Sequence, residues 1–420
     1  MITFLFIITF LLALLWLLAM TKELRTPLGT FLILSYLGRL PLHWVTRNVA
    51  LFSHGVGGDW ILYEMLATYI ARKWEHQGIH YVTNEDIGYT SLPPNMFAVL
   101  VYFNGGPTSL GCTALVALAV CMTALTFYRL GIELEVDPKI ALQLTVVFFA
   151  SPAVVFYSSD MFKDGLVLMF VLGAVASGIR LSRKFSVLDV LLGSLSLWAL
   201  WYIRYYMVFL ASGPFLIGFI GLRARGWVRT FLVVVVFAAG IALAVQSGAT
   251  KEVANVAQRT FALGVDKNVL HDNTVSGGSG VQFAGTGIAA YPTKLLYTLF
   301  SPFPWMPGSL AFQIGKIDTI FFYYVMYRSF LAARKLWKED RVLLGMLAAF
   351  IVPTTLAYAT TMANIGLMLR QRLPIVAAFT LLAMRSWPKA GSVPVKLEKA
   401  PSGVPARRVR VPIRRPARIM

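Results

Sequence analysis

The first twenty residues, MITFLFIITFLLALLWLLAM at positions 1–20, contain no charged side chain. A helix of about 20 apolar residues is long enough to cross the hydrocarbon core of a bilayer. The stretch has no basic segment before it and no small-residue cleavage site at its end, which is typical of an anchor and not of a removable signal peptide. It therefore predicts a first membrane span.

The composition of the whole chain agrees with this prediction. Of 420 residues, 57% are hydrophobic and only 14% are charged, with a mean hydropathy of +0.68. Soluble domains usually have about a quarter of their residues charged. So much apolar surface cannot be buried within a water-soluble globule, which excludes a soluble enzyme, a disordered protein and a disulfide-stapled secreted domain. The two cysteines, Cys112 and Cys121, form neither a CxxC motif nor a zinc pattern, so we interpret them as packing residues.

Hydropathy predicts an all-α fold, a polytopic transmembrane helix bundle of about eleven spans that occupies residues 1–386. The predicted spans are 1–20, 27–45, 108–128, 139–157, 165–180, 186–203, 206–222, 229–246, 316–336, 341–360 and 373–386. Two polar stretches, 46–92 and 247–291, separate groups of spans and are predicted to be long loops. The second is rich in Gly, Ser and Thr.

The net charge of +19 indicates the orientation of the bundle, because basic residues favour cytoplasmic loops. With residues 387–420 in the cytoplasm and the sides alternating, nearly all of the net positive charge falls on the cytoplasmic side. The loops 46–92 and 247–291 then lie outside. Residues 385–420 contain ten basic residues and one acid, so we expect a disordered basic cytoplasmic tail beside anionic lipid headgroups. Its arginines are not interleaved with aromatic residues, so nucleic acid is not expected as a partner.

Two segments of the first outer loop region are predicted to be juxtamembrane helices on the outer leaflet. Residues 92–104 are apolar but too short to cross the membrane. Residues 60–74 form an amphipathic pattern whose predicted apolar face consists of Ile61, Met65, Leu66, Ile70 and Trp74.

Ionisable residues at span ends that cytoplasmic bias does not explain are candidates for function, because charge is costly in a membrane. On the outer side these candidates, with one aromatic neighbour, are Asp59, Asp160, Lys163, Asp164, Arg204, Tyr205, Arg370 and Arg372. Arginine forks match phosphate oxygens, and a carboxylate near a sugar hydroxyl can act as a general base. Together they suit a substrate that carries a phosphate or pyrophosphate.

Each candidate also has a simpler interpretation. Asp59 follows two glycines and precedes a helix, so it fits an N-cap. The acids and lysine at 160–164 fit local pairing within a turn, and the arginines fit side chains that reach outer headgroups.

Several short motifs resemble a known family. The first outer loop region resembles that of GT-C-type membrane glycosyltransferases, a group that includes the protein O-mannosyltransferases, the lipid A aminoarabinose transferase and many bacterial polysaccharide enzymes. The motifs that carry this likeness are GDWILYEMLA (58–67), LPPNMFA (92–98) and YFNGG (102–106). Three later segments resemble bacterial polysaccharide-assembly membrane proteins, namely SSDMFKD (158–164), LFSPFPW (299–305) and NIGLMLRQR (364–372).

The resemblance implies a membrane glycosyltransferase in the bacterial inner (plasma) membrane. It would transfer a sugar from a polyprenyl-phosphate-linked donor to a glycan, lipid or protein acceptor at the outer face. Asp59 would deprotonate the acceptor hydroxyl or help to hold a divalent metal, Mg²⁺ or Mn²⁺. The side chains expected to bind the leaving lipid phosphate are Lys163, Arg204, Arg370 and Arg372.

The sequence departs from the family at one position. Many relatives have two adjacent acids where this chain has Asp59 followed by Trp60, and the next acid is Glu64.

Two other functions stay open. An O-antigen-type polysaccharide polymerase or ligase would depend on the outer arginines more than on Asp59. A transporter or flippase of a lipid-linked or anionic substrate would require paired charges near the bilayer midplane and broken helices.

Overall fold

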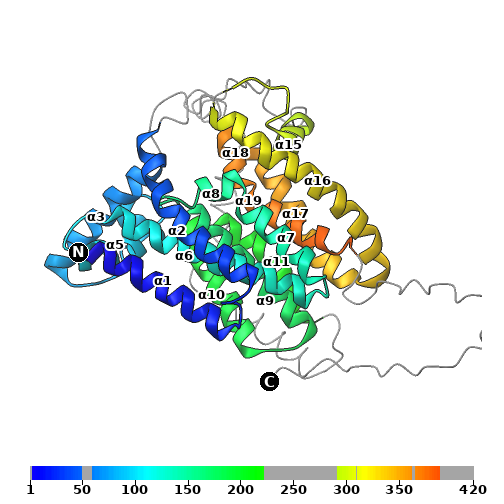
Figure 1. The fold of residues 1–420 in the computed structure, drawn as a ribbon, viewed down its shortest axis with the longest axis horizontal. Helices are drawn as coiled ribbons and strands as arrows, with labels where there is room; N and C mark the ends of the chain where they lie inside the picture. Colours follow the sequence, from blue (N-terminus) through cyan, green and yellow to red (C-terminus); the bar gives the residue numbers. More distant parts are fainter. Residues whose placement is uncertain (1, 50–58, 222–290, 309, 362–364, 388–420) are drawn as a thin grey trace, which may run out of the picture.

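A computed structural model describes residues 2–49, 59–221, 291–308, 310–361 and 365–387. Of these residues 83% are helical and none is in a strand, so the predicted all-α class is confirmed (Figure 1). The predicted span 229–246, the loop 247–291 and the tail beyond residue 387 lie outside the described residues.

The described helices follow one another along the chain as a series of long and short segments. Their bounds are α1 (Ile2–Met20), α2 (Pro27–Asn48), α3 (Asp59–Gln77), α4 (Asn84–Ile87), α5 (Leu92–Asn104), α6 (Ser109–Glu133), α7 (Pro138–Phe149), α8 (Pro152–Phe156), α9 (Asp164–Arg183), α10 (Val187–Arg204), α11 (Tyr206–Ile220), α15 (Tyr291–Phe300), α16 (Leu310–Glu339), α17 (Arg341–Thr361), α18 (Ile365–Gln371) and α19 (Leu373–Met384).

Five described helices, α1, α6, α9, α10 and α17, are long and apolar enough to cross a membrane. Three further apolar helices, α7, α11 and α19, have 12 to 15 residues. The chain is therefore a membrane-embedded helical protein. Helix α19 is buried along nearly its whole length among α16, α17, α7 and α9, so it does not have to match the bilayer thickness.

The predicted number of about eleven spans is not confirmed, since the predicted spans 27–45 and 316–336 form α2 and α16, which are not among the five candidates. The predicted span 139–157 differs in its secondary structure. Instead of a single helix over 139–157, the chain forms α7 and α8, which are separated at Ala150 and Ser151. Ser151 precedes Pro152, and the residue before a proline is disfavoured in helical geometry. The carboxylate of Asp318 in α16 accepts the backbone N–H of Ala153 at 3.1 Å, which satisfies a donor at the start of α8.

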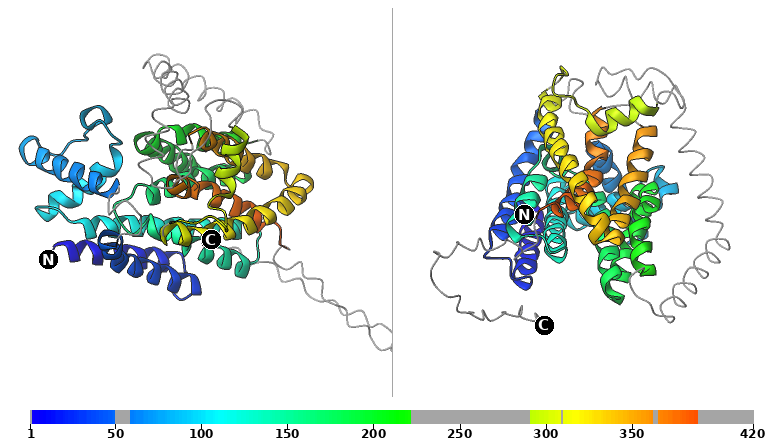
Figure 2. Two further views of the ribbon diagram at one scale, coloured as in Figure 1. Left: turned by 90° about the horizontal axis from the view of Figure 1, so that it is seen from above. Right: turned by 90° about the vertical axis from the view of Figure 1, so that its right-hand side faces the viewer.

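Helix α9 lies at the centre of the bundle, packed against α6, α10 and α11 (Figures 1 and 2). Glycines allow its close approach to α11. A Cβ atom on Gly178 would lie 2.5 Å from the carbonyl oxygen of Pro214, and one on Gly218 would lie 2.0 Å from that of Gly178. Small residues of this kind let helix backbones come together in membranes. At the edge of the bundle, α1 buries Leu14 and Leu18 but exposes most of its other side chains.

Helices α3, α4 and α5 form a lobe beside the bundle (Figure 2). Both predicted juxtamembrane segments are helical, but the predicted apolar face of α3 is only partly correct. The side that packs on α5 contains Tyr63, Ala67, Ile70 and Trp74, whereas Met65 is 63% exposed. The buried side of α3 thus differs from the predicted apolar face, because part of that face packs against α5.

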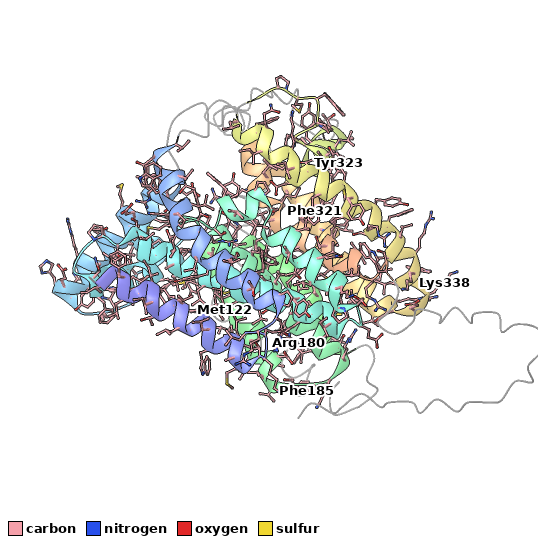
Figure 3. All side chains as sticks on the ribbon, viewed as in Figure 1. Met122, Arg180, Phe185, Phe321, Tyr323 and Lys338 are labelled. Atoms are coloured by element: carbon pink, nitrogen blue, oxygen red, sulfur yellow. The ribbon has the colours of Figure 1, made fainter. Side chains whose placement is uncertain are left out.

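Several segments that charge bias assigned to the cytoplasmic side meet at one end of the bundle. Arg180, which is labelled in Figure 3, lies in the last turn of α9 and pairs with Glu133 at 2.9 Å. Arg183 donates to the carbonyl oxygen of Glu133, and Arg385 donates to that of Leu134. The opposite end contains the residues described next.

Candidate functional site

A chain of ion pairs links four helix ends. Arg370 of α18 donates from Nη2 to Oδ2 of Asp59 and from Nε to Oδ2 of Asp164. Arg204 of α10 donates from Nη2 to the other oxygen of Asp164, Oδ1, at 3.1 Å. The order Asp59–Arg370–Asp164–Arg204 therefore brings together four of the predicted site residues, which come from α3, α18, α9 and α10.

Each of these charges suits its place on a helix. Asp59 and Asp164 are the first residues of α3 and α9, where the helix dipole favours negative charge. Arg204 is the last residue of α10, and Arg370 lies in the last turn of α18, where the dipole favours positive charge. The cluster is thus built where helices begin and end, which leaves the apolar middles of α9 and α10 uninterrupted.

The two carboxylates differ in access to solvent. The side chain of Asp164 is 2% exposed, whereas that of Asp59 is 32% exposed. Burial raises the pKa of Asp59, whereas the positive charges of Arg370, Lys163 and Arg204 lower it. The combined effect of the three cations is larger, so the pKa of Asp59 lies below its ordinary value. Asp59 is therefore an ionised carboxylate that a second molecule can reach.

Lys163 adds a positive charge beside this series of ion pairs. Within the described residues its Nζ makes no ion pair, and it lies 5.1 Å from the centroid of the Tyr89 ring. Burial, Arg204 and Arg370 lower the pKa of Lys163 to about 8. Two carboxylates and three cations give the cluster a formal charge of +1, and among the described residues Lys163 is the cation of the cluster that makes no ion pair with a carboxylate.

Aromatic rings enclose the cluster. The rings of Tyr157 and Phe162 lie 5.9 Å and 6.0 Å from the guanidinium carbon of Arg370. The ring of Tyr206, the residue after the predicted Tyr205, lies 6.0 Å from that of Arg204. Tyr205 itself lies between α10 and α11, as the residue that precedes α11, and its ring centroid is 5.8 Å from that of Tyr206.

Asp160 belongs to a neighbouring network that sequence analysis did not foresee. Arg47 of α2 donates to both oxygens of Asp160, at 3.0 Å and 3.1 Å, and also to Glu64 of α3 at 2.9 Å. His43 Nδ1 lies 3.3 Å from Asp160. The network joins α2, α3 and the loop before α9. The local pairing that we considered for residues 160–164 is not among the ion pairs of the described residues, since those of Asp160 and Asp164 go to other helices.

Arg372 has a different environment from Arg370, two residues earlier. Its guanidinium donates to the carbonyl oxygens of Leu299 and Ser301, at 3.1 Å and 2.8 Å, and to Oγ1 of Thr319 at 3.0 Å. The side chain is buried and holds the end of α15 and the residue after it in place. These contacts favour a structural role in place of the predicted phosphate contact.

The described residues do not suit a divalent metal. Within them, no group of three or more His, Cys, Asp or Glu side chains lies close enough to hold an ion. The two carboxylates of the cluster are bridged by Arg370. We therefore derive no step through Mg²⁺ or Mn²⁺.

Fold and site together define an integral membrane protein of the all-helical class, with a cationic cluster at one end of its bundle. A comparison with known proteins finds no matching family model, no similar curated protein and no similar solved structure.

Proposed function

We propose that the protein is a membrane glycosyltransferase that uses a polyprenyl-phosphate-linked sugar at the extracytoplasmic face. The observation that carries the proposal is the convergence of Asp59, Lys163, Asp164, Arg204 and Arg370 from separate helix ends. One accessible carboxylate beside a group of cations matches the two chemical needs of this reaction, a base for a hydroxyl and a site for a leaving phosphate.

In the proposed reaction, the acceptor hydroxyl oxygen attacks the anomeric carbon of the donor sugar. The bond between that carbon and the phosphate oxygen breaks, and the polyprenyl phosphate leaves with the electron pair. Asp59 takes the proton of the hydroxyl. Lys163 and Arg370 hold the phosphate, where negative charge grows as the bond breaks.

The buried Asp164 positions the cations in this scheme. It accepts from both Arg204 and Arg370, so their guanidinium groups are fixed before the donor arrives. Arg370 also donates to Asp59. A donor phosphate competes with Asp59 for this guanidinium, so donor binding releases Asp59 and raises its basicity at the moment when a base is needed.

A polysaccharide polymerase or ligase is the second candidate, and the presence of two arginines, Arg370 and Arg204, on the buried Asp164 favours it. Both functions use a lipid-linked sugar. They differ in the donor, which is a monophosphate-linked sugar for the transferase and a pyrophosphate-linked repeat unit for the polymerase.

The test is reconstitution of the full chain in proteoliposomes with undecaprenyl phosphate that carries radiolabelled glucose, galactose or mannose, or with undecaprenyl-pyrophosphate repeat units. The transferase proposal expects release of undecaprenyl phosphate and a labelled acceptor product from the first set. Products from the second set alone would favour the polymerase. Movement of label across the bilayer without a covalent product would identify a transporter or flippase and overturn both.

A further inference from the structure

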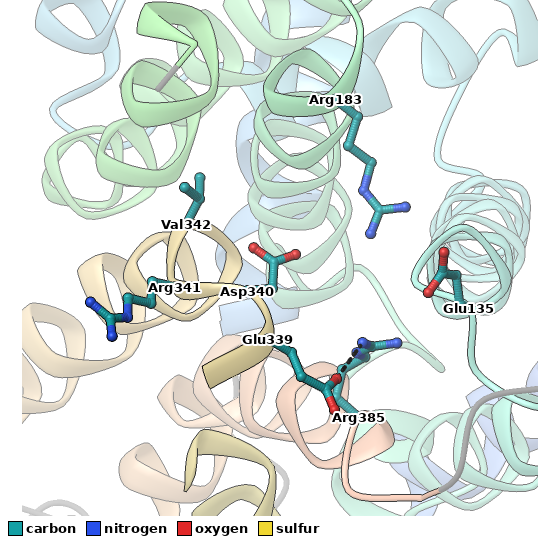
Figure 4. A pocket seen from close by; sticks show the side chains of 7 residues that line it. All are labelled: Glu135, Arg183, Glu339, Asp340, Arg341, Val342 and Arg385. Atoms are coloured by element: carbon teal, nitrogen blue, oxygen red, sulfur yellow. Dashed lines mark ion pairs between the residues drawn. The ribbon is translucent and has the colours of Figure 1, made fainter. Parts of the chain in front are cut away.

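A second charged site lies at the other end of the bundle. A cavity of about 460 Å³ is lined there by three arginines, three acids and one valine (Figure 4). These residues are Glu135, Arg183, Glu339, Asp340, Arg341, Val342 and Arg385. Helix α9 connects the two sites, since it begins at Asp164 and ends at Arg183. Its 20 residues extend about 30 Å at about 1.5 Å per residue, which equals the thickness of the hydrocarbon core.

Arg385 is the residue that points to a ligand. Its side chain is 6% exposed, and Nη1 donates to the carbonyl oxygen of Leu134. Nη2 lies 3.5 Å from Oε2 of Glu339, which is long for an ion pair with a hydrogen bond. Its buried Nε has no hydrogen-bond partner among the described residues. A buried guanidinium N–H without an acceptor is costly, so an acceptor from outside the chain would stabilise the site.

The formal charges of the cavity cancel, with three guanidinium groups and three carboxylates. A purely anionic ligand would meet both attraction and repulsion there. A ligand with one phosphate and one ammonium group would place each charge beside a side chain of opposite sign.

Exposed apolar side chains follow or precede the lining residues in the sequence. Trp337, near the end of α16, is 61% exposed and its ring lies 5.4 Å from the guanidinium carbon of Arg341. Phe185 and Leu188, which follow Arg183, are exposed as well. Aromatic side chains at the ends of spanning helices are typical of the boundary between headgroups and acyl chains.

We propose that this cavity binds the headgroup of a zwitterionic aminophospholipid of the phosphoethanolamine class. Arg385 and Arg183 donate to the phosphate oxygens, and the exposed Arg341 adds positive charge at the edge of the cavity. The ammonium group donates to Glu339 and its acidic neighbours, and the acyl chains lie against the exposed apolar side chains at the rim.

The experiment is native mass spectrometry of the full chain in detergent with equal amounts of phosphatidylethanolamine, phosphatidylglycerol or phosphatidylcholine. Phosphatidylglycerol lacks the ammonium, and the trimethylated ammonium of phosphatidylcholine cannot donate N–H hydrogen bonds. We expect phosphatidylethanolamine to be retained about tenfold more than either lipid. Equal retention of the three lipids by the unmodified protein would overturn the proposal.

Variants assign the binding to the cavity. Arg385→Gln should reduce retention of phosphatidylethanolamine about tenfold, and Glu339→Gln should lower its preference over phosphatidylglycerol. Because Arg385 is buried, Arg341→Gln at an exposed position of the same cavity gives a second measurement if the first variant does not fold. The control is Lys338→Gln, an exposed charge beside Glu339 that does not line the cavity. Retention that is unchanged in the cavity variants, or equally reduced in the control, would contradict the proposal.

Discussion

The guanidinium of Arg370 donates a hydrogen bond to the carboxylate of Asp59, 311 residues earlier in the chain. This contact connects the lobe of α3–α5 to α18 at the end of the bundle. It also joins the candidate base to the candidate phosphate-binding group, so the two parts of the proposed reaction are coupled before any substrate binds.

The buried anchor of the cluster should matter most for stability. Asp164→Asn removes the charged partner of Arg204 and one of the two carboxylate partners of Arg370, and removal of one member of a buried ion pair costs about 3–5 kcal/mol. Glu133→Gln, which removes the exposed partner of Arg180, is the matched control and should cost below about 1 kcal/mol. The measurement is the free energy of unfolding in detergent. Equal losses in the two variants would show that Asp164 does not anchor the cluster.

Lys163 predicts a pH dependence. Its pKa of about 8 in the folded protein lies below the ordinary value of 10.5, so the lysine loses its proton as pH rises through about 8. Donor binding should weaken over that range, because a cation beside the phosphate is lost. Folding stability should change in the opposite direction, rising between about pH 8 and pH 10.5, since the unfolded state binds more protons there.

The variant Lys163→Arg separates these effects, because arginine keeps its charge across this range. The pH–rate profile of this variant should therefore lack the decline near pH 8. A decline of the same size at the same pH in the variant would assign the titration to another group.

Arg370 and Arg372 should respond differently to the same substitution. Arg372→Lys loses the fork that contacts Leu299, Ser301 and Thr319, so the free energy of unfolding should fall by about 2–4 kcal/mol while turnover per folded molecule is retained. Arg370→Lys should instead lose most of its turnover. The measurements are the melting temperature and the specific activity of both purified variants. An equal loss of activity per folded molecule in the two variants would indicate that Arg372 also acts in the site.

The contact between α9 and α11 gives a prediction about packing. Gly178→Ala places a Cβ atom against the carbonyl oxygen of Pro214, which should destabilise the protein by about 1–3 kcal/mol. Gly345→Ala is the control, because its Cβ atom meets no atom within 4 Å and alanine favours the helix. Thermal unfolding of both variants measures the difference, and an unaffected Gly178→Ala protein would argue against the tight crossing.

The sequence predicted much of the cluster because a simple physical rule applies there. Asp59, Lys163, Asp164, Arg204 and Arg370 are charges at the ends of predicted helices, and the structure brings them together. A position at a helix end does not show whether a charged side chain points into the site or into the protein interior. The sequence therefore also predicts Arg372 as a site residue, although its contacts lie in the protein interior.

Other features depend on tertiary contacts that the sequence pattern does not contain. Arg47, in the last turn of α2, is not among the predicted site residues, and no local pattern pairs it with Asp160, which is 113 residues away in the sequence. The buried side of α3 depends on the position of α5. The break between α7 and α8 had a local signal in Ser151-Pro152, which hydropathy averaging concealed.

The most direct test of the account is the turnover number of Asp59→Asn in sugar transfer from the polyprenyl-phosphate donor, compared with Glu75→Gln. Glu75 is an exposed acid on the same helix and serves as the matched control. The account predicts a fall of about 10²–10⁴ in kcat for Asp59→Asn without a rise in the KM for the donor, because the variant lacks the carboxylate that competes for Arg370. Glu75→Gln should have normal turnover. Full turnover in a folded Asp59→Asn protein would contradict the central claim that this carboxylate is the base.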